Sequence, residues 1–141
     1  MREILFRGKD IAGNWHYGVP LVFTEDYVCI TAPHTYNKAV QPHTVGQYTG
    51  LTDKNGKKIF EGDIVKAQDD VYGSPFCNGI VGKVVYEETA FFIETPNIID
   101  SQYLFNECAV YEVIGNIHDN PELLKGGVAY DAVLGNTEDK G

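Results

Sequence analysis

Short runs in which apolar and polar residues alternate fill most of this chain. Alternation with a period of two is typical of half-buried β-strands, because successive side chains of a strand point to opposite faces of the sheet. The runs that predict strands cover residues 3–7, 14–18, 21–23, 27–31, 45–50, 59–65, 80–86, 90–94 and 111–117. Many short strands at close spacing, without an internal repeat, favour a barrel or sandwich over an α/β layer.

Two tight turns stand out between these runs. Asn55-Gly56 joins two apolar runs, and both residue types tolerate the positive φ angles that a type I′ hairpin turn requires. The run 59–65 passes through the corner Gly62-Asp63, where Gly permits a sharp bend and Asp can bond the backbone of the turn. A hydrophobic residue on each side of such a corner is common in small SH3-like barrels. We therefore predict an all-β fold with barrel-like or SH3-like parts.

The other segments predict loops, one short helix and a tail. Pro and Asn place polar loops at 32–43 and 67–79, and 97–107 fits either a short helix or irregular packing. Asn120-Pro121-Glu122 predicts one short C-terminal helix near 120–125, because Asn caps a helix, Pro suits its first position and Glu favours its positive end. The Gly- and acid-rich residues 126–141 are expected to be a tail that is loose unless a partner holds it.

Charge is unevenly distributed along the 141 residues, whose formal net charge is -9. Residues 1–60 hold seven Lys or Arg and five Asp or Glu, whereas 61–141 hold four and fifteen. An acidic chain is poorly suited to gripping phosphates without specificity, and the simplest reading of the acidity is solubility. No apolar run approaches the roughly 18 residues of a membrane helix, and the N-terminus lacks the apolar core of a signal peptide. We expect a cytoplasmic protein without a membrane partner.

Three segments carry a family resemblance: 2–8, 45–65 and 111–124. They resemble the start, middle and end of the YopX family of phage and prophage proteins, in the same order. The resemblance implies an all-β fold with barrel-like parts and a small helical element. It also implies a phage or prophage gene expressed in a bacterial cytoplasm. It implies no activity, and it supplies no catalytic residues.

Nearly every residue in these segments has a turn, cap or core role in a tightly turned β fold. The positions assigned to structure in this way are Gly46, Asn55, Gly56, Gly62, Asp63, Gly115, Asn120 and Pro121. We therefore interpret the segments as architecture rather than as an active site. We expect a YopX-like β domain over 1–125, either as one body or as two packed sub-barrels at about 1–45 and 46–125.

No motif commits the chain to a catalytic, cofactor-binding or metal-binding site. The histidines lack metal-ligand spacing, the cysteines form no C-x-x-C pair, and a Cys77 nucleophile would need a nearby His that the sequence cannot show. The carboxylates are expected to be solvated turn residues, with a weak divalent-cation site as the sharper alternative. The residues considered are His16, His34, His43, His118, Cys29, Cys77, Cys108, Asp63, Asp69, Asp70, Glu87 and Glu88. No cofactor is predicted, and an enzyme ranks third among the hypotheses.

Binding is therefore the preferred class of function. The acidic C-terminal half favours a protein partner or self-association, so the first hypothesis is a non-enzymatic binding or interaction module. The alternative is a small nucleic-acid-binding β-barrel, because aromatic and basic faces of small barrels can stack bases, although the net charge counts against it. The residues predicted for a binding face are Trp15, Tyr17, Tyr48, Lys54, Lys57 and Lys58.

Overall fold

A computed structural model describes residues 3–69, 79–96, 102–104 and 109–124 of the chain. Its internal contacts divide the chain into two compact units, Met1–Leu51 and Thr52–Gly141. Several sequence-based expectations lie outside the described residues: most of the loop at 67–79, most of 97–107, the tail at 126–141, and the thiols of Cys77 and Cys108.

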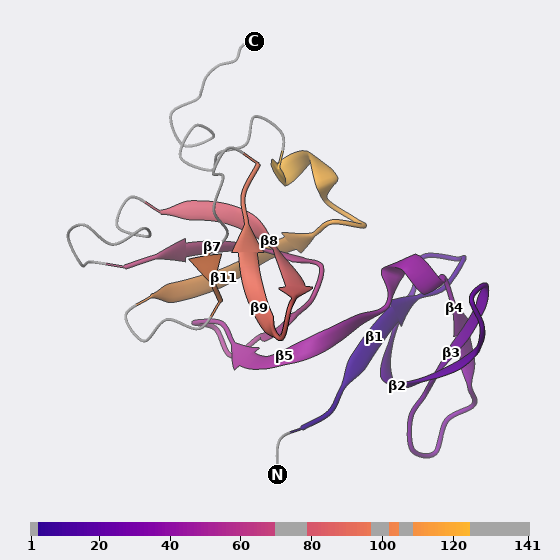
Figure 1. Cartoon of the computed structure of the whole chain (residues 1–141). Coiled ribbons are helices and arrows are strands. Elements are labelled where there is room, and N and C mark those ends of the chain that lie inside the picture. Colours follow the sequence, from indigo (N-terminus) through magenta and orange to yellow (C-terminus); the bar gives the residue numbers. More distant parts are fainter. Residues whose placement is uncertain (1–2, 70–78, 97–101, 105–108, 125–141) are drawn as a thin grey trace. The chain divides into compact units, whose positions relative to one another are not determined.

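The first unit is an antiparallel sheet (Figure 1). Within this unit the strand order is β4-β3-β2-β1-β5. Its elements are β1 (Phe6–Lys9), β2 (Trp15–Thr24), β3 (Tyr27–Thr31), β4 (Lys38–Val40), the 3-10 helix η1 (Pro42–Thr44) and β5 (Gly46–Thr52). One face of this sheet carries a small core in which Val28, Ile30 and Val40 are buried, with Phe6 and Val45 packed against them.

Two glycines allow the strands of this unit to approach closely. A Cβ on Gly8 would lie 2.8 Å from Cγ2 of Val40, and one on Gly18 would lie 2.0 Å from the carbonyl oxygen of Thr31. Real Cβ atoms do not approach backbone oxygens so closely, and a strand interior otherwise disfavours Gly. The small core therefore depends on the absence of side chains at these two positions.

The second unit contains a five-stranded antiparallel sheet of order β10-β9-β8-β7-β11. The five strands of this sheet are β7 (Asp63–Gln68), β8 (Ile80–Glu87), β9 (Ala90–Glu94), β10 (Gln102–Tyr103) and β11 (Val110–Asn116). The unit also contains β6 (Lys58–Phe60), which is not part of this sheet. The side chains that fill its core are at most 4% exposed: Ile59, Phe60, Ile64, Val65, Ala67, Val81, Val84, Ile93 and Leu104. The predicted all-β class is confirmed. In the described residues neither sheet closes into a barrel, so the barrel-like part of the expectation is not what the strands form.

The turn at Asn55-Gly56 is not the predicted type I′ turn, because only Gly56, at φ 81°, has a positive φ. The Asp53 carboxylate joins this turn to a distant strand. Its Oδ1 accepts hydrogen bonds from the backbone N–H groups of Asn55 at 2.8 Å and Lys57 at 2.9 Å. Its Oδ2 accepts the N–H of Val113 at 2.9 Å, sixty residues later in the chain. Beside it, the N–H of Lys54 donates to the carbonyl of Tyr111 at 2.9 Å. β11 pairs with β7 along one edge only. The turn binds backbone groups on its other edge and so protects that edge of the sheet.

The Gly62-Asp63 corner bends the chain from β6 into β7. Gly62 has φ 92°, a left-handed conformation that favours glycine, and its N–H donates to Val84 at 2.8 Å. The Asp63 side chain is 1% exposed, and its Oδ2 accepts the N–H of Phe60 at 2.7 Å. The corner therefore has the role predicted for it: Gly supplies the bend and Asp bonds the turn backbone.

The end of β11 is closed by a network of asparagine side chains. Oδ1 of Asn116 accepts the N–H groups of His118 and Asp119, each at 2.9 Å, and Oδ1 of Asn120 accepts the N–H of Asn116 at 3.3 Å. A Cβ on Gly115 would lie 2.6 Å from the same Asn120 oxygen. Pro121 then begins the four-residue 3-10 helix η2 (Pro121–Leu124).

We expect Asp53→Asn to lower the free energy of unfolding by about 1–3 kcal/mol, because the amide group would turn an N–H toward a buried backbone donor. Urea unfolding followed by circular dichroism measures this change. Glu87→Gln, at the exposed end of β8, is the control, and it should change stability by less than about 0.5 kcal/mol. Equal stabilities of Asp53→Asn and wild type would contradict the assigned role.

The same carboxylate predicts a pH dependence. Burial raises the pKa of Asp53, but the three N–H donors and the charge of Lys57 outweigh burial and hold this pKa below its ordinary value. A lowered folded pKa gives stability that is present above the unfolded pKa, near about 4, and is lost as the pH falls through the folded value. The stability difference between wild type and Asp53→Asn should therefore shrink between neutral pH and about pH 3. A difference independent of pH would contradict this assignment.

Candidate binding face

Large apolar side chains lie exposed along one face of β2 and the start of β3. Alternate residues of a strand share a face, and Tyr17, Val19, Leu21 and Phe23 of β2 are 49%, 47%, 38% and 57% exposed. Tyr27 of β3 is 50% exposed, and its ring stacks on Phe23 with 5.0 Å between ring centroids. We call these five residues the β2–β3 face.

The β2–β3 face lies opposite the core of the same sheet. On β3, Val28 and Ile30 are buried in the core, whereas Tyr27 points to the other side. The pairing of Leu21 with Cys29 places the buried thiol of Cys29 on the side of the exposed row. The first unit therefore has an apolar surface on both sides of β2 and β3; its own core covers one side only in part, because Val22 on that side is 70% exposed.

Basic side chains stand at the Trp15 end of this face. The register pairs Arg7 with Tyr17 and Lys9 with Trp15, so these side chains share the face of the apolar row. The guanidinium carbon of Arg7 lies 4.7 Å from the centroid of the Trp15 ring, and Nζ of Lys9 lies 6.0 Å from it. Both distances are within the range of cation–π attraction, which draws positive charge onto the ring.

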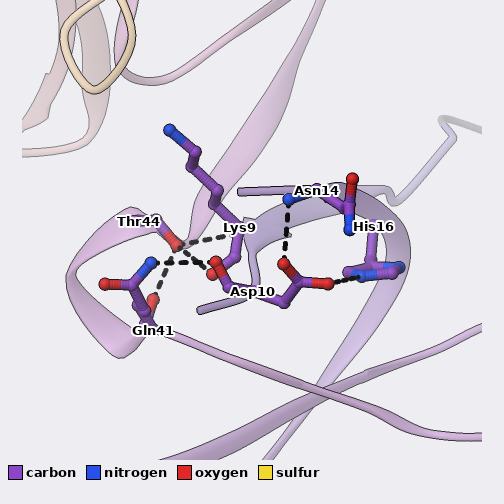
Figure 2. Close-up of polar contacts among 6 residues, drawn as sticks. All are labelled: Lys9, Asp10, Asn14, His16, Gln41 and Thr44. Atoms are coloured by element: carbon purple, nitrogen blue, oxygen red, sulfur yellow. Dashed lines mark hydrogen bonds and ion pairs between the residues drawn. The ribbon is translucent and has the colours of Figure 1, made fainter. Parts of the chain in front are cut away.

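The loop between β1 and β2 is held by the Asp10 carboxylate (Figure 2). Its Oδ1 accepts the backbone N–H of Asn14 at 2.8 Å, and its Oδ2 lies 2.8 Å from Nε2 of His16. The hydrogen bond to His16 is the main cause that lowers the pKa of Asp10 to about 2, with the N–H of Asn14 next. The carboxylate is thus ionised at all ordinary pH values and closes the loop that leads into Trp15.

A second set of bonds ties η1 to the end of β1 (Figure 2). The Thr44 hydroxyl donates to the carbonyl of Gln41 at 2.6 Å and accepts the N–H of Lys9 at 2.8 Å. The Gln41 side-chain amide donates to the carbonyl of Asp10 at 3.0 Å. Because Lys9 and Asp10 are bound at their backbones, the basic end of the β2–β3 face has a fixed support. This polar cluster is therefore a scaffold rather than a reactive centre.

The second unit has a depression of about 290 Å³ on its sheet. It is lined by Lys54, Lys66, Gln68, Asp69, Val110, Tyr111 and Glu112. Nζ of Lys54 lies 3.6 Å from Oε1 of Glu112, so part of its charge is matched internally. Burial, and then the charge of Asp69, raise the pKa of Tyr111 to about 12, and its phenol donates to the carbonyl of Leu104. A phenol of that pKa serves as a hydrogen-bond donor and not as a base near neutral pH.

The structure brings together three of the six residues predicted for a binding face. Trp15 and Tyr17 are alternate residues of β2, and the register of β5 on β1 places Tyr48 on the same side of the sheet. The other three belong to the second unit: Lys54 and Lys57 lie in the Asp53 turn, and Lys58 begins β6. Whether the two groups act together stays a prediction.

The continuation of the aromatic face along β2 was not predicted from the sequence. Separate strands were expected at 14–18 and 21–23, as parts of two hairpins. In the structure β2 runs unbroken through Pro20, which pairs with Ile30. The signal that was available is the alternation of Tyr17, Val19, Leu21 and Phe23 across the proline.

The other candidates for chemistry take ordinary structural places. Among the described residues, no group of three or more His, Cys, Asp or Glu is arranged to hold a metal ion. Asp63 bonds a turn, Asp69 lines the depression, and Glu87 and Glu88 lie at the β8–β9 turn. The histidines His34, His43 and His118 lie in loops and in η1, while Asp70, Cys77 and Cys108 fall outside the described residues. No helix in the described part of the chain is long and apolar enough to span a membrane.

Comparison with known proteins gives a family and a related structure. The sequence model of the family described as YopX protein matches residues 9–125, which include two of the three segments that carried the resemblance. The crystal structure of protein EF1440 from Enterococcus faecalis is similar, with 28% sequence identity and a TM-score of 0.54. The similarity covers 89% of this chain and 100% of that one. No curated protein matches this chain.

We expect His16→Ala to raise the pKa of Asp10 from about 2 toward its ordinary value of 3.8, because the largest cause of the lowering is removed. Titration of the Asp10 carboxyl carbon by NMR measures this pKa. The control is His34→Asn, which lies in an exposed loop at φ 63°, where Asn is tolerated. If the pKa of Asp10 stayed near 2 in His16→Ala, the assigned cause would be wrong.

Proposed function

This chain belongs to the YopX family, and from that membership together with the β2–β3 face we propose that it is a non-enzymatic binding module. The module recognises a protein surface through the five exposed side chains of this face. The observation that carries the proposal is the contiguous exposure of Tyr17, Val19, Leu21, Phe23 and Tyr27. Single exposed apolar residues are common, whereas a contiguous row is characteristic of a surface that another molecule covers.

The composition of the face supports a protein partner. Aromatic residues are enriched at protein interfaces because they bury large areas with few side-chain rotations. Three of the five residues are aromatic, and the Phe23–Tyr27 stack presents a rigid unit. We also propose, from the family, an origin in a phage or prophage gene and a place in the bacterial cytoplasm. An SH3-like character is proposed from the Gly62-Asp63 corner alone.

Nucleic-acid binding is the second candidate, and a specific observation favours it. Lys9 lies beside Trp15, on the sheet face that also carries Tyr17 and Tyr48, whereas the neighbouring Arg7 is buried. Aromatic platforms next to cations can stack single-stranded bases. The net charge of -9 opposes it, because phosphate binding gains its affinity from positive charge. We therefore place a protein partner first.

Capture from a nuclease-treated bacterial lysate tests the two candidates together. We expect wild-type protein to retain a protein partner that Phe23→Ser loses, because the variant removes an aromatic ring from the exposed row. Tyr36→Ser is the matched control, since Tyr36 is 88% exposed in a loop outside the face. Mass spectrometry of the retained material measures the outcome.

The outcomes separate the hypotheses. Retention that is the same for Phe23→Ser and wild type would overturn the proposed face. Retention lost on nuclease treatment, together with bound oligonucleotide, would favour the nucleic-acid alternative. The single tryptophan, Trp15, gives a direct check of that alternative, because a base stacked on its ring would quench its fluorescence.

A further inference from the structure

The β2–β3 face is electrically asymmetric along its length. Lys9 stands at the Trp15 end of β2, and Arg7 beside it is buried, so Lys9 carries the charge that this end presents. At the other end, the turn between β2 and β3 presents the exposed acids Glu25 and Asp26. The turn is fixed by a hydrogen bond from the N–H of Asp26 to the hydroxyl of Thr24, at 3.2 Å. The row of apolar side chains thus has a positive end and a negative end.

Two copies of this face have complementary charges when a two-fold rotation places one against the other. In a two-fold symmetric interface the same patch faces itself, so a residue at one end meets the residue at the other end of the second copy. The two-fold axis lies between the two sheets and runs at right angles to β2 near Val19. It brings the two faces together and makes the two β2 strands antiparallel. Lys9 of each copy then faces Glu25 and Asp26 of the other, while Tyr17, Leu21 and Phe23 meet in the middle. Sheets packed face to face in this way lie about 10 Å apart.

The opposite charges at the two ends of the row also disfavour partners whose charges all have the same sign. A nucleic acid or an acidic peptide along the row would be attracted at Lys9 and repelled at Asp26, and a basic peptide would meet the reverse. Like charges placed opposite each other in an interface reduce affinity. A second copy is the occupant for which both ends of the row are attractive.

We propose that the chain forms a two-fold symmetric homodimer through the β2–β3 face, with Lys9 of each copy opposite the Glu25-Asp26 turn of the other. This inference rests on the proposed function and names its partner as a second copy of the chain. The apolar centre supplies the affinity, and the charged ends set the antiparallel orientation. The face is then buried in the assembly, which accounts for its apolar character.

A charge-reversal experiment tests the dimer. Two variants of the full chain are made, Lys9→Glu and Asp26→Lys, and molar mass is measured by sedimentation over a dilution series. Lys9→Glu places a carboxylate opposite the Glu25-Asp26 turn at both ends of the interface, and Asp26→Lys places a second lysine, beside Glu25, opposite Lys9 at both ends. We expect each to weaken the dimer by at least about tenfold. Circular dichroism shows whether each variant remains folded.

Mixing the two variants gives the decisive measurement. In a mixed dimer, Glu at position 9 faces Lys at position 26, and the native Lys9 faces the native Asp26, so both ends are again complementary. We expect an equimolar mixture to recover wild-type dimer affinity. If a variant failed to dimerise because it was misfolded, mixing it with the other variant would not restore the dimer. Phe23→Ser should weaken the dimer in a way that neither charge variant rescues.

The contrary outcomes are distinct from those of the proposed function. Wild-type protein that is monomeric throughout the dilution series would overturn the dimer. A mixture that remains monomeric while the wild type dimerises would overturn the antiparallel orientation, and with it this proposal. If the wild type is monomeric but Phe23→Ser still loses a captured protein, the binding function stands and only its assignment to a second copy fails.

Discussion

A buried carboxylate with three backbone donors organises the second unit. Asp53 accepts the N–H groups of Asn55 and Lys57 within its own turn and that of Val113 on β11. A buried carboxylate is favourable only when donors replace its lost hydration, and these donors do so. The bond to Val113 and the neighbouring bond from Lys54 to Tyr111 attach the turn to the edge of β11. The start of β6, the shape of the turn and the protection of that edge therefore depend on one side chain.

The first unit follows a different constraint, which is the close approach of its strands. Gly8 and Gly18 let Val40 and Thr31 come near the backbone, and a core of only a few residues results. A core of this size covers one face of the sheet only in part and leaves the β2–β3 face without apolar cover from the same strands. The small core and the exposed row therefore have the same origin, which is the close approach of the strands in this sheet. The polar cluster of Asp10, Gln41 and Thr44 holds the loops around it with hydrogen bonds in place of apolar packing.

Local features of the fold were accessible from the sequence, and long-range ones were not. The position of the turn at Asn55-Gly56, the Gly62-Asp63 corner and the turn that begins at Pro121 follow from backbone preferences of neighbouring residues, although the first turn is not of type I′, because only Gly56 has a positive φ. The partner of Asp53 is Val113, and no pattern along the chain links an aspartate to an amide sixty residues away. The binding face was found in part: Trp15 and Tyr17 were expected, but 14–18 and 21–23 were assigned to two hairpins, so the continuity of β2 and the rest of the row were missed. That Tyr48 lies on the same face follows from the register of β5 on β1, and this register is known only from the structure.

The sequence separation of these contacts also bears on the order in which the two units can form. Each of β1 to β5 finds a pairing partner within the first 52 residues, so the first sheet can assemble while the remainder of the chain is still being synthesised. The second sheet needs β11 beside β7, and the Asp53 turn needs Val113, so neither is complete until residue 116 has emerged from the ribosome. Contacts that close long loops form slowly. The apolar row on β2 is consequently formed before the second sheet can be completed.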